Sequence, residues 1–374
     1  MSSKLLSRLL LIPVILFLGL ELILWIFIRI PLEPLKQINL SNDLPGLKPD
    51  VRLEFDKNLT RYLYAPGSKP AGRLRILCLG GSGTFGLLQS ASDTWWGQLG
   101  RQLEAKGIPV EVAAWGQDRT GIVASTPVAA AIMEDWKPDV VIGNFGFDDV
   151  VGQPIEYEYL PGKGRNLAEP SRPAGWKQAI LRVSQIARFF RWSTRRTEAS
   201  QIQNNIGRSN YWKDTFTKMK KQVNEMTAQQ LPPRDPAKDP LQEYLDGWKI
   251  LQELCSRHGT TLIMTGEASL HGAEASFSLE ENLLALVPLK NDTSQQARVV
   301  RPEPAWVELE MTRYAAAASD LAASSKLPWV NLNGMVPRET KYFFSDVILT
   351  DAGATRLAQE LLPTVEPVLQ AQKK

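Results

Sequence analysis

The segment Arg75-Ile-Leu-Cys-Leu-Gly-Gly-Ser-Gly-Thr-Phe-Gly86 decides the fold of this chain of 374 residues. Its apolar run ends at two glycines, which can adopt positive φ, and Ser82 follows them just before a predicted helix. Such a turn places the Ser82 hydroxyl at the carboxyl end of a strand, where open α/β sheets form their sites. The glycines also fit a phosphate-binding loop or a plain turn. No Lys-Ser or Lys-Thr pair follows them, which argues against the phosphate loop.

Short apolar segments alternate with helical patterns along the rest of the chain. This alternation predicts a parallel sheet with helices on both faces. A further short strand is expected at 51–55. The other predicted strands are 75–79, 110–114, 140–144, 261–265 and 329–332, and the predicted helices are 95–106, 124–136, 241–257, 304–324 and 352–370.

Four segments follow one another in a recognisable order. They are the serine turn, the strand 110–116 that ends in glycine, Gly146-Phe-Asp-Asp149, and Ser345-Asp-Val-Ile-Leu-Thr350 before the last helix. Together they resemble the four blocks of the SGNH (GDSL-like) hydrolases and acyltransferases, in the membrane-anchored bacterial form. The resemblance implies an α/β domain over residues 73–370, a flavodoxin-like three-layer sandwich around a parallel sheet.

The resemblance also implies roles for single residues. Ser82 takes the nucleophile position, and its backbone N–H and that of Gly116 are two donors of an oxyanion hole. The family's third donor is the asparagine of a GxND block, where this chain has Asp148. An ionised carboxylate only accepts hydrogen bonds, so it repels a developing oxyanion. Loss of one such donor typically costs about 10²–10³ in rate.

The fourth block departs from the family pattern as well. It normally reads Asp-x-x-His before Leu-Thr, so Leu349-Thr350 places Ile348 at the histidine position and Ser345 at the aspartate position. If one residue has been deleted instead, Asp346 is the retained acid. Neither register contains a histidine, and the resemblance therefore implies a degenerate catalytic triad.

The chain contains only two histidines. His258 is expected at the end of a helix before a buried strand, where an imidazole favourably meets the helix dipole. His271 follows the predicted strand 261–265 and is one alternative general base, as are Asp148 and Asp149. Without a base the serine hydroxyl is a weak nucleophile, because its proton has no acceptor when the new bond forms.

The composition indicates a single folded core and gives no sign of a redox or metal site. An apolar content of 44% with eleven tryptophans suffices for the core of one α/β domain. Cys78 and Cys255 are expected as small core residues rather than as a redox pair. No Cys/His cluster has the spacing of metal ligands, so we expect neither a metal nor another cofactor.

Residues 9–30 are apolar apart from Glu21 and Arg29 and are long enough for one transmembrane helix. No cleavage site follows, which predicts an uncleaved anchor and, after it, a Pro-rich tether over 31–72. The charges around the anchor favour a cytoplasmic N-terminus (1–8) and a periplasmic or extracellular main domain, as in a single-pass protein of a bacterial inner membrane. Glu21 is either a tolerated protonated carboxyl or a contact to a polar group of a neighbouring membrane helix.

A basic insertion is expected at about 153–240. Residues 163–222 hold fourteen Lys or Arg against three Asp or Glu, a net charge of +11, whereas the whole chain carries +3. This mixture of charge and aromatic residues fits contact with anionic lipid or with an acidic partner, or a solvated helix face. Nucleic acid is not an expected partner, because no binding motif accompanies the charge. The arginines of its most aromatic stretch are Arg188, Arg191, Arg195 and Arg196.

Two functional hypotheses follow. The first is a catalytically degenerate SGNH-like domain that serves as a structural or interaction subunit, with integral membrane proteins as partners. The second is an active ester hydrolase or acyltransferase that acts on lipid or glycan of the cell envelope, with Ser82 activated by a group outside the family pattern. We favour the first, because it explains the missing histidine, Asp148, Glu21 and the basic insertion together.

Overall fold

The computed structural model describes residues 36–41, 47–48, 50–56, 59–64, 67–86, 88–117, 120–151, 211–226, 228, 231, 240–272, 281–288 and 299–372. The predicted anchor with Glu21, and the part of the basic insertion that contains Arg188, Arg191, Arg195 and Arg196, lie outside these residues. Among the helices that are described, none is both long and apolar enough to cross a membrane.

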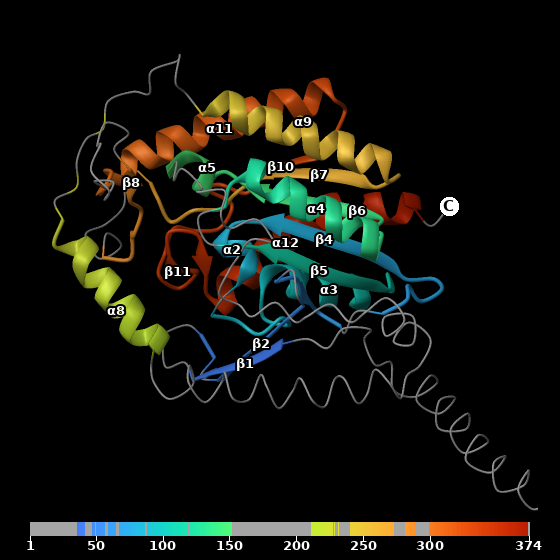
Figure 1. Ribbon diagram of the computed structural model, residues 1–374, viewed down its shortest axis with the longest axis horizontal. Helices are drawn as coiled ribbons and strands as arrows, with labels where there is room; N and C mark the ends of the chain where they lie inside the picture. The colour runs from blue at the N-terminus through green and yellow to red at the C-terminus, as the bar shows by residue number, and fades with distance from the viewer. Residues whose placement is uncertain are drawn as a thin grey trace, which may run out of the picture.

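A six-stranded sheet forms the centre of the described fold (Figure 1). Counted along the chain, its five parallel strands lie in the order 2-1-3-4-5, which is the flavodoxin-like order. This confirms the predicted α/β class with a mostly parallel sheet, and β3 adds an antiparallel strand at one edge. From edge to edge the strands are β10 (Trp329–Asn331), β7 (Thr261–Gly266), β6 (Val140–Phe145), β4 (Leu74–Gly80), β5 (Val110–Gly116) and β3 (Arg61–Tyr62).

Helices cover both faces of the sheet because its inner strands are apolar on both sides. In β4, Leu77 and Leu79 belong to one core cluster, and Ile76 and Cys78 belong to the other, as the alternation of side chains along a strand requires. The first cluster packs under α4 (Ile122–Trp136), α9 (Leu241–Arg257) and α11 (Pro304–Ser324), and the second packs under α3 (Trp95–Ala105) and α12 (Asp351–Gln372) (Figure 1).

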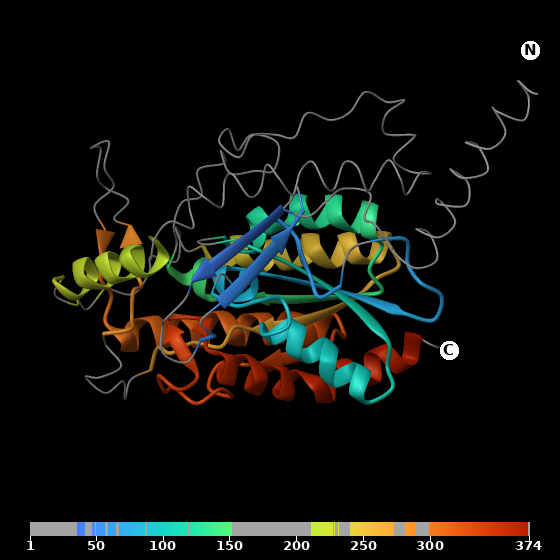
Figure 2. The same cartoon turned by 90° about the horizontal axis from the view of Figure 1, so that it is seen from below.

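The segment before residue 73 takes part in the fold. β1 (Lys36–Ser41) and β2 (Asp50–Phe55) form an antiparallel hairpin, which lies in front of the sheet in Figure 2. The apolar residues of β2 alternate with charged ones, so that Val51, Leu53 and Phe55 are buried together. The strand predicted at 51–55 is thereby confirmed. The sequence did not predict β3, which lies within the range assigned to the tether.

Arg61 of β3 is fully buried and binds the turn that follows the serine. Its guanidinium donates to the carbonyl oxygens of Gly86 and Gln89, each at 2.7 Å, and lies 5.7 Å from the centre of the Trp96 ring. Burial lowers the pKa of Arg61 to about 9. The edge strand therefore anchors the N-terminal segment to the loop beyond Ser82.

The remaining described elements are short or peripheral. Two antiparallel pairs join β8 (Val287–Pro288) to β9 (Val299–Val300) and β11 (Phe343–Ser345) to β12 (Ile348–Leu349). The short helices α2 (Ser82–Phe85) and α5 (Phe147–Val151) each follow a strand of the sheet. Helix α8 (Tyr211–Asn224) belongs to the predicted basic insertion and lies to one side of the sheet (Figure 1).

Candidate active site

The serine turn is built by close approaches of backbone that only glycine allows. A Cβ placed on Gly80 would lie 2.2 Å from Oγ1 of Thr84, and one on Gly81 would lie 2.0 Å from Oδ2 of Asp148. The turn continues into α2, which makes a single turn and ends at Gly86, where φ is 64°. Ser82 thus begins a short helix at the carboxyl end of β4, as the sequence predicted.

The structure brings the three predicted oxyanion positions together around this turn. Gly116, the last residue of β5, approaches the serine turn closely. A Cβ placed on Gly116 would lie 2.5 Å from the carbonyl oxygen of Gly81. Asp148 lies in α5 with 8% of its surface exposed, and its carboxylate contacts Gly81. The position predicted for the third oxyanion donor therefore carries a carboxyl group next to the serine turn.

Asp149 lies behind this cluster and stabilises the start of α4. Its Oδ1 accepts a hydrogen bond from the backbone N–H of Ile122 at 2.9 Å. Burial raises the pKa of Asp149 to about 7. Because this carboxyl binds a helix N-terminus, its position fits a structural role better than that of a base for Ser82.

Glu267 is a buried group that the sequence analysis missed. It follows β7 directly, and its Oε2 accepts a hydrogen bond from the Phe147 N–H at 3.0 Å. A Cβ on Gly83 would lie 3.4 Å from Oε1, which has no hydrogen-bond partner among the described residues. Burial, with a smaller contribution from the charge of Asp149, raises the pKa of Glu267 to about 8. In the sequence, the place of Glu267 directly after a predicted strand, at the carboxyl edge of the sheet, was the signal that could have identified it.

The fourth block forms the β11–β12 hairpin, which rests on the serine turn. Ser345 and Ile348 pair across the hairpin, and a Cβ on Gly83 would lie 2.6 Å from the carbonyl oxygen of Val347. The block therefore lies beside the nucleophile position, with Ile348 at the histidine position of the first predicted register and Asp346 as the retained acid of the second. The hydroxyl of Ser82, which is half-buried, makes no hydrogen bond to another described residue.

Asp346, in the turn of that hairpin, binds His271. Nε2 of His271 lies 2.8 Å from Oδ1 of Asp346, and the same carboxylate accepts hydrogen bonds from the backbone N–H groups of Leu284 and Ala285. The ring of Phe147 stacks on the imidazole with centroids 5.5 Å apart. In the sequence, His271 and Asp346 were separate candidates for the base and the acid, and their contact was not predicted.

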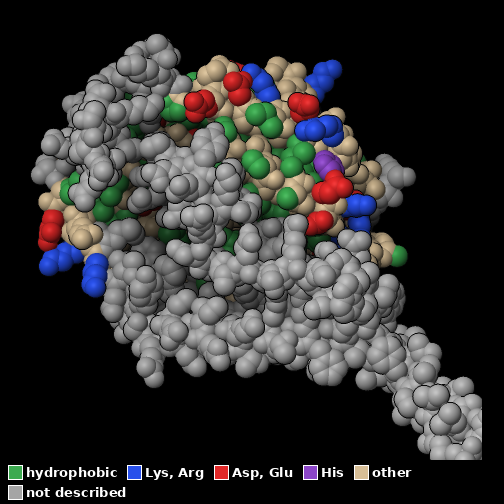
Figure 3. Space-filling view, in the orientation of Figure 1, with side chains coloured by type: hydrophobic (Ala, Val, Ile, Leu, Met, Phe, Trp, Pro, Cys, Tyr) green, Lys and Arg blue, Asp and Glu red, His purple; other side chains and the backbone are tan. Residues whose placement is uncertain are grey.

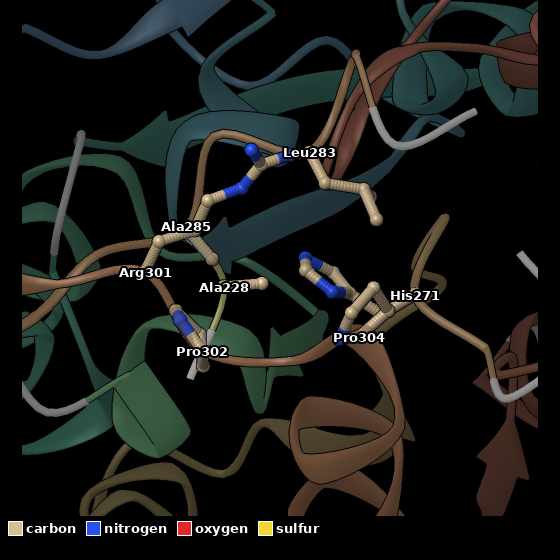
Figure 4. Close-up of a pocket in the computed structure, with 7 residues that line it drawn as sticks. All are labelled: Ala228, His271, Leu283, Ala285, Arg301, Pro302 and Pro304. Carbon is tan, nitrogen blue, oxygen red and sulfur yellow. The ribbon is translucent and has the colours of Figure 1, made fainter. Parts of the chain in front are cut away.

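The two histidines differ in their surroundings. His258 is the exposed C-cap of α9 before β7, which confirms its predicted place. His271 is 1% exposed and lines a small cavity together with Arg301 and five apolar residues (Figure 4). Ser82 is not among the residues that line this cavity.

The described residues offer no group of three or more His, Cys, Asp or Glu side chains that could hold a metal ion. Cys78 and Cys255 are both buried and free. Burial raises the pKa of the Cys255 thiol to about 12, which keeps it in the unreactive protonated form. This agrees with the prediction that both cysteines belong to the core.

No protein-family model and no curated protein matches the chain. Among solved structures it is similar to TesA (10% identity, 79% of this chain and 99% of that chain, TM-score 0.40). It is also similar to a putative lipolytic protein of the G-D-S-L family from Desulfitobacterium hafniense DCB-2 (10% identity, 78% and 98%, TM-score 0.39). A third is the psychrotrophic esterase EstA from Pseudoalteromonas sp. (6% identity, 79% and 98%, TM-score 0.39).

Proposed function

We propose that this chain is an SGNH-like domain that has lost the standard triad chemistry and serves as a structural or interaction subunit at a membrane. One point carries the proposal: the fourth block, in the hairpin beside Ser82, contains no histidine, whether Ile348 replaces it or one residue has been deleted. An aliphatic side chain cannot accept the hydroxyl proton, so Ser82 has no activating partner there.

The electrostatics of the turn support the same conclusion. Acyl transfer builds negative charge on the substrate oxygen, and donors must be aimed at that oxygen. The Asp148 carboxylate contacts Gly81 instead. When ionised, this carboxylate opposes the developing oxyanion and offers no donor, so the turn carries an acceptor at the predicted position of the third donor.

The membrane part of the proposal rests on the distribution of charge. The chain carries +3 in total and +11 within 163–222, so the remainder carries 3 − 11 = −8. The described face in Figure 3 mixes acidic and basic side chains. Helix α9 balances its charges in the same way, in the ion pairs Lys249–Asp246 and Arg257–Glu253. The basic excess is therefore local, which favours a dedicated contact with an anionic surface.

Hydrolysis of short acyl nitrophenyl esters by the full-length protein in mild detergent tests the loss of catalysis. We expect the Ser82→Ala variant to hydrolyse them as fast as the wild type. Ser324→Ala is a matched control, because Ser324 lies exposed on α11 and bonds only within its helix. A rate that depends on Ser82, or labelling of Ser82 by a fluorophosphonate, would overturn the proposal.

One observation favours the alternative of an active hydrolase, namely the Asp346–His271 pair. A carboxylate that orients an imidazole is the second half of a catalytic triad. If the protein is an active hydrolase, a conformational change must bring His271 to Ser82. The rate would then fall by orders of magnitude in both Ser82→Ala and His271→Gln, whereas His258→Gln would leave it unchanged.

A further inference from the structure

The hairpin β1–β2, which lies in front of the sheet in Figure 2, carries a hydrophobic cluster of its own. Val51, Leu53 and Phe55 are buried together, and Leu59 packs against them. Within the described part of the chain, these residues belong to neither of the two clusters that fill the faces of the sheet. Units that share few apolar contacts with the rest of a protein open locally, at a lower free energy than the whole fold.

The polar contacts of the hairpin segment reach the loop between α2 and α3, which follows the serine turn. The backbone N–H of Arg52 donates to Oγ of Ser90 at 3.0 Å, and the ammonium of Lys48, just before β2, pairs with the Asp93 carboxylate. The Lys48 side chain is 56% exposed, so this ion pair contributes little to stability. Ser90 and Asp93 lie in the half of the loop that is farther from the serine turn.

The chain beyond Leu59 is bound to the domain much more firmly. The guanidinium of Arg61 is buried and donates to backbone carbonyl oxygens in the near half of the same loop. Tyr62 belongs to the first core cluster, and its ring meets that of Trp136 edge-on with centroids 6.0 Å apart. β3 therefore has contacts with the core that the hairpin lacks.

The junction between the two parts is strained. Leu59 has a φ of 63°, in the left-handed region that a bulky side chain rarely adopts. Hydrogen bonds hold it there, because the Leu59 N–H donates to the carbonyl oxygen of Asp56 at 3.1 Å and the Thr60 N–H donates to Oδ1 of Asp56 at 2.9 Å. Strained backbone of this kind persists only where its surroundings enforce it, and it is common in segments that switch.

We propose that the hairpin β1–β2 is a lid that opens and closes as one unit about the turn from Asp56 to Thr60, while β3 stays in the sheet. When closed, the lid holds the far half of the loop after the serine turn. When open, it frees that half, whereas Arg61 still binds the near half. β1 is the first described element, so a partner that holds the chain before residue 36 acts on the lid first. The lid is independent of whether Ser82 is active.

Thiol labelling of the full-length protein in mild detergent tests the opening. Leu53→Cys places a thiol in the buried cluster of the lid, and the native Cys78, buried in β4, reports on unfolding of the whole domain. A buried thiol reacts only while it is exposed, so we expect the thiol at position 53 to be labelled about a hundredfold faster than Cys78. Equal rates would overturn the proposal, because the hairpin would then open only with the whole fold.

Substitution of Ser90 tests the contact between the lid and the loop. In the Leu53→Cys background, Ser90→Ala removes the acceptor of the Arg52 N–H and should speed labelling at position 53 about fivefold, while Cys78 keeps its rate. Ser324→Ala is the matched control on α11 and should change neither rate. The lid is refuted if Ser90→Ala speeds both thiols alike or affects neither.

Substitution of Leu59 tests the hinge. Leu59→Gly and Leu59→Ala both remove the packing of the leucine, but only glycine relieves the left-handed strain. Labelling at position 53 should therefore be about threefold to tenfold slower in Leu59→Gly than in Leu59→Ala, and equal rates would exclude this turn as the hinge. Hydrogen exchange of the wild-type protein repeats the comparison without any substitution. If its β2 amides exchange as slowly as those of β4, the proposal is wrong.

Discussion

Replacement of Glu267 by glutamine tests whether the carboxyl beside the serine turn is protonated at neutral pH. The side chain is 3% exposed, and its pKa is raised from the ordinary 4.5 to about 8. The folded protein therefore keeps this proton after the unfolded chain has released its own. Below about pH 4.5 both states are protonated, and stability does not depend on this group. From there to about pH 8 the folded state loses stability, and above that the loss is complete.

The size of the effect follows from the same pKa values. Within the window, each pH unit costs up to about 1.4 kcal/mol, so the step from pH 5 to pH 7 costs on the order of 3 kcal/mol. That is a large share of a total stability of about 5–15 kcal/mol. The amide of glutamine can still accept the Phe147 N–H but carries no charge. We expect Glu267→Gln to match the wild type near pH 5 and to be more stable near pH 8.

Urea unfolding of the full-length protein at pH 5, 6, 7 and 8, followed by tryptophan fluorescence in constant detergent and salt, measures this difference. Because the pKa of Asp149 is also raised, to about 7, the stability of Glu267→Gln should still fall as the pH rises, but less steeply than that of the wild type. Glu253→Gln is the matched control, because the Glu253 side chain is 73% exposed on α9, and it should keep the wild-type slope. Equal slopes for wild type and Glu267→Gln would refute the assignment of a buried, protonated carboxyl.

Three further predictions concern the turn, the missing groups and the membrane. Gly83→Ala should destabilise the fold by about 1–3 kcal/mol in urea unfolding, because its Cβ would meet the backbone oxygen of Val347 at 2.6 Å; a neutral result would mean that the β11–β12 hairpin moves freely. Installing the family's aspartate, histidine and asparagine should produce measurable esterase activity. If that variant folds but is inert, while insertion of a histidine after Ile348 restores activity, the deletion register is the correct one. Glu21→Leu should weaken co-purification of membrane partners in mild detergent. Replacement of four arginines by serine should make binding to anionic vesicles less sensitive to salt. The interaction role would be contradicted if the wild-type protein purified alone and both variants behaved as it does. The substitutions of the second test are Ser345→Asp, Ile348→His and Asp148→Asn, and the four arginines are Arg188, Arg191, Arg195 and Arg196.

The sequence predicted the features that depend on neighbouring residues. The apolar run before Gly80, the alternation in β2 and the helical periodicity of α9 and α12 each lie within one element, so their pattern is visible in a short window. The serine turn was predictable for the same reason. Its glycines stand next to one another in the chain, and the structure shows the close approaches that require them.

The features that the sequence did not predict depend on residues far apart in the chain. His271 and Asp346 are 75 positions apart and meet only because the loop after β7 and the β11–β12 hairpin reach the same edge. Glu267 stands directly after β7, but that position does not reveal how deeply its side chain is buried, and burial is what raises its pKa. β3 has two residues, too few for a period of two to be recognised.

The two-residue strand β3 moves the practical boundary of the domain. A fragment that begins at residue 73 would keep all five parallel strands, yet it would uncover residues 113–114 of β5 as an open edge. It would also leave the carbonyl oxygens of Gly86 and Gln89 without the guanidinium that binds them. Open edges pair with other chains. A fragment without the residues before 73 is therefore expected to self-associate more readily than the chain that keeps β3.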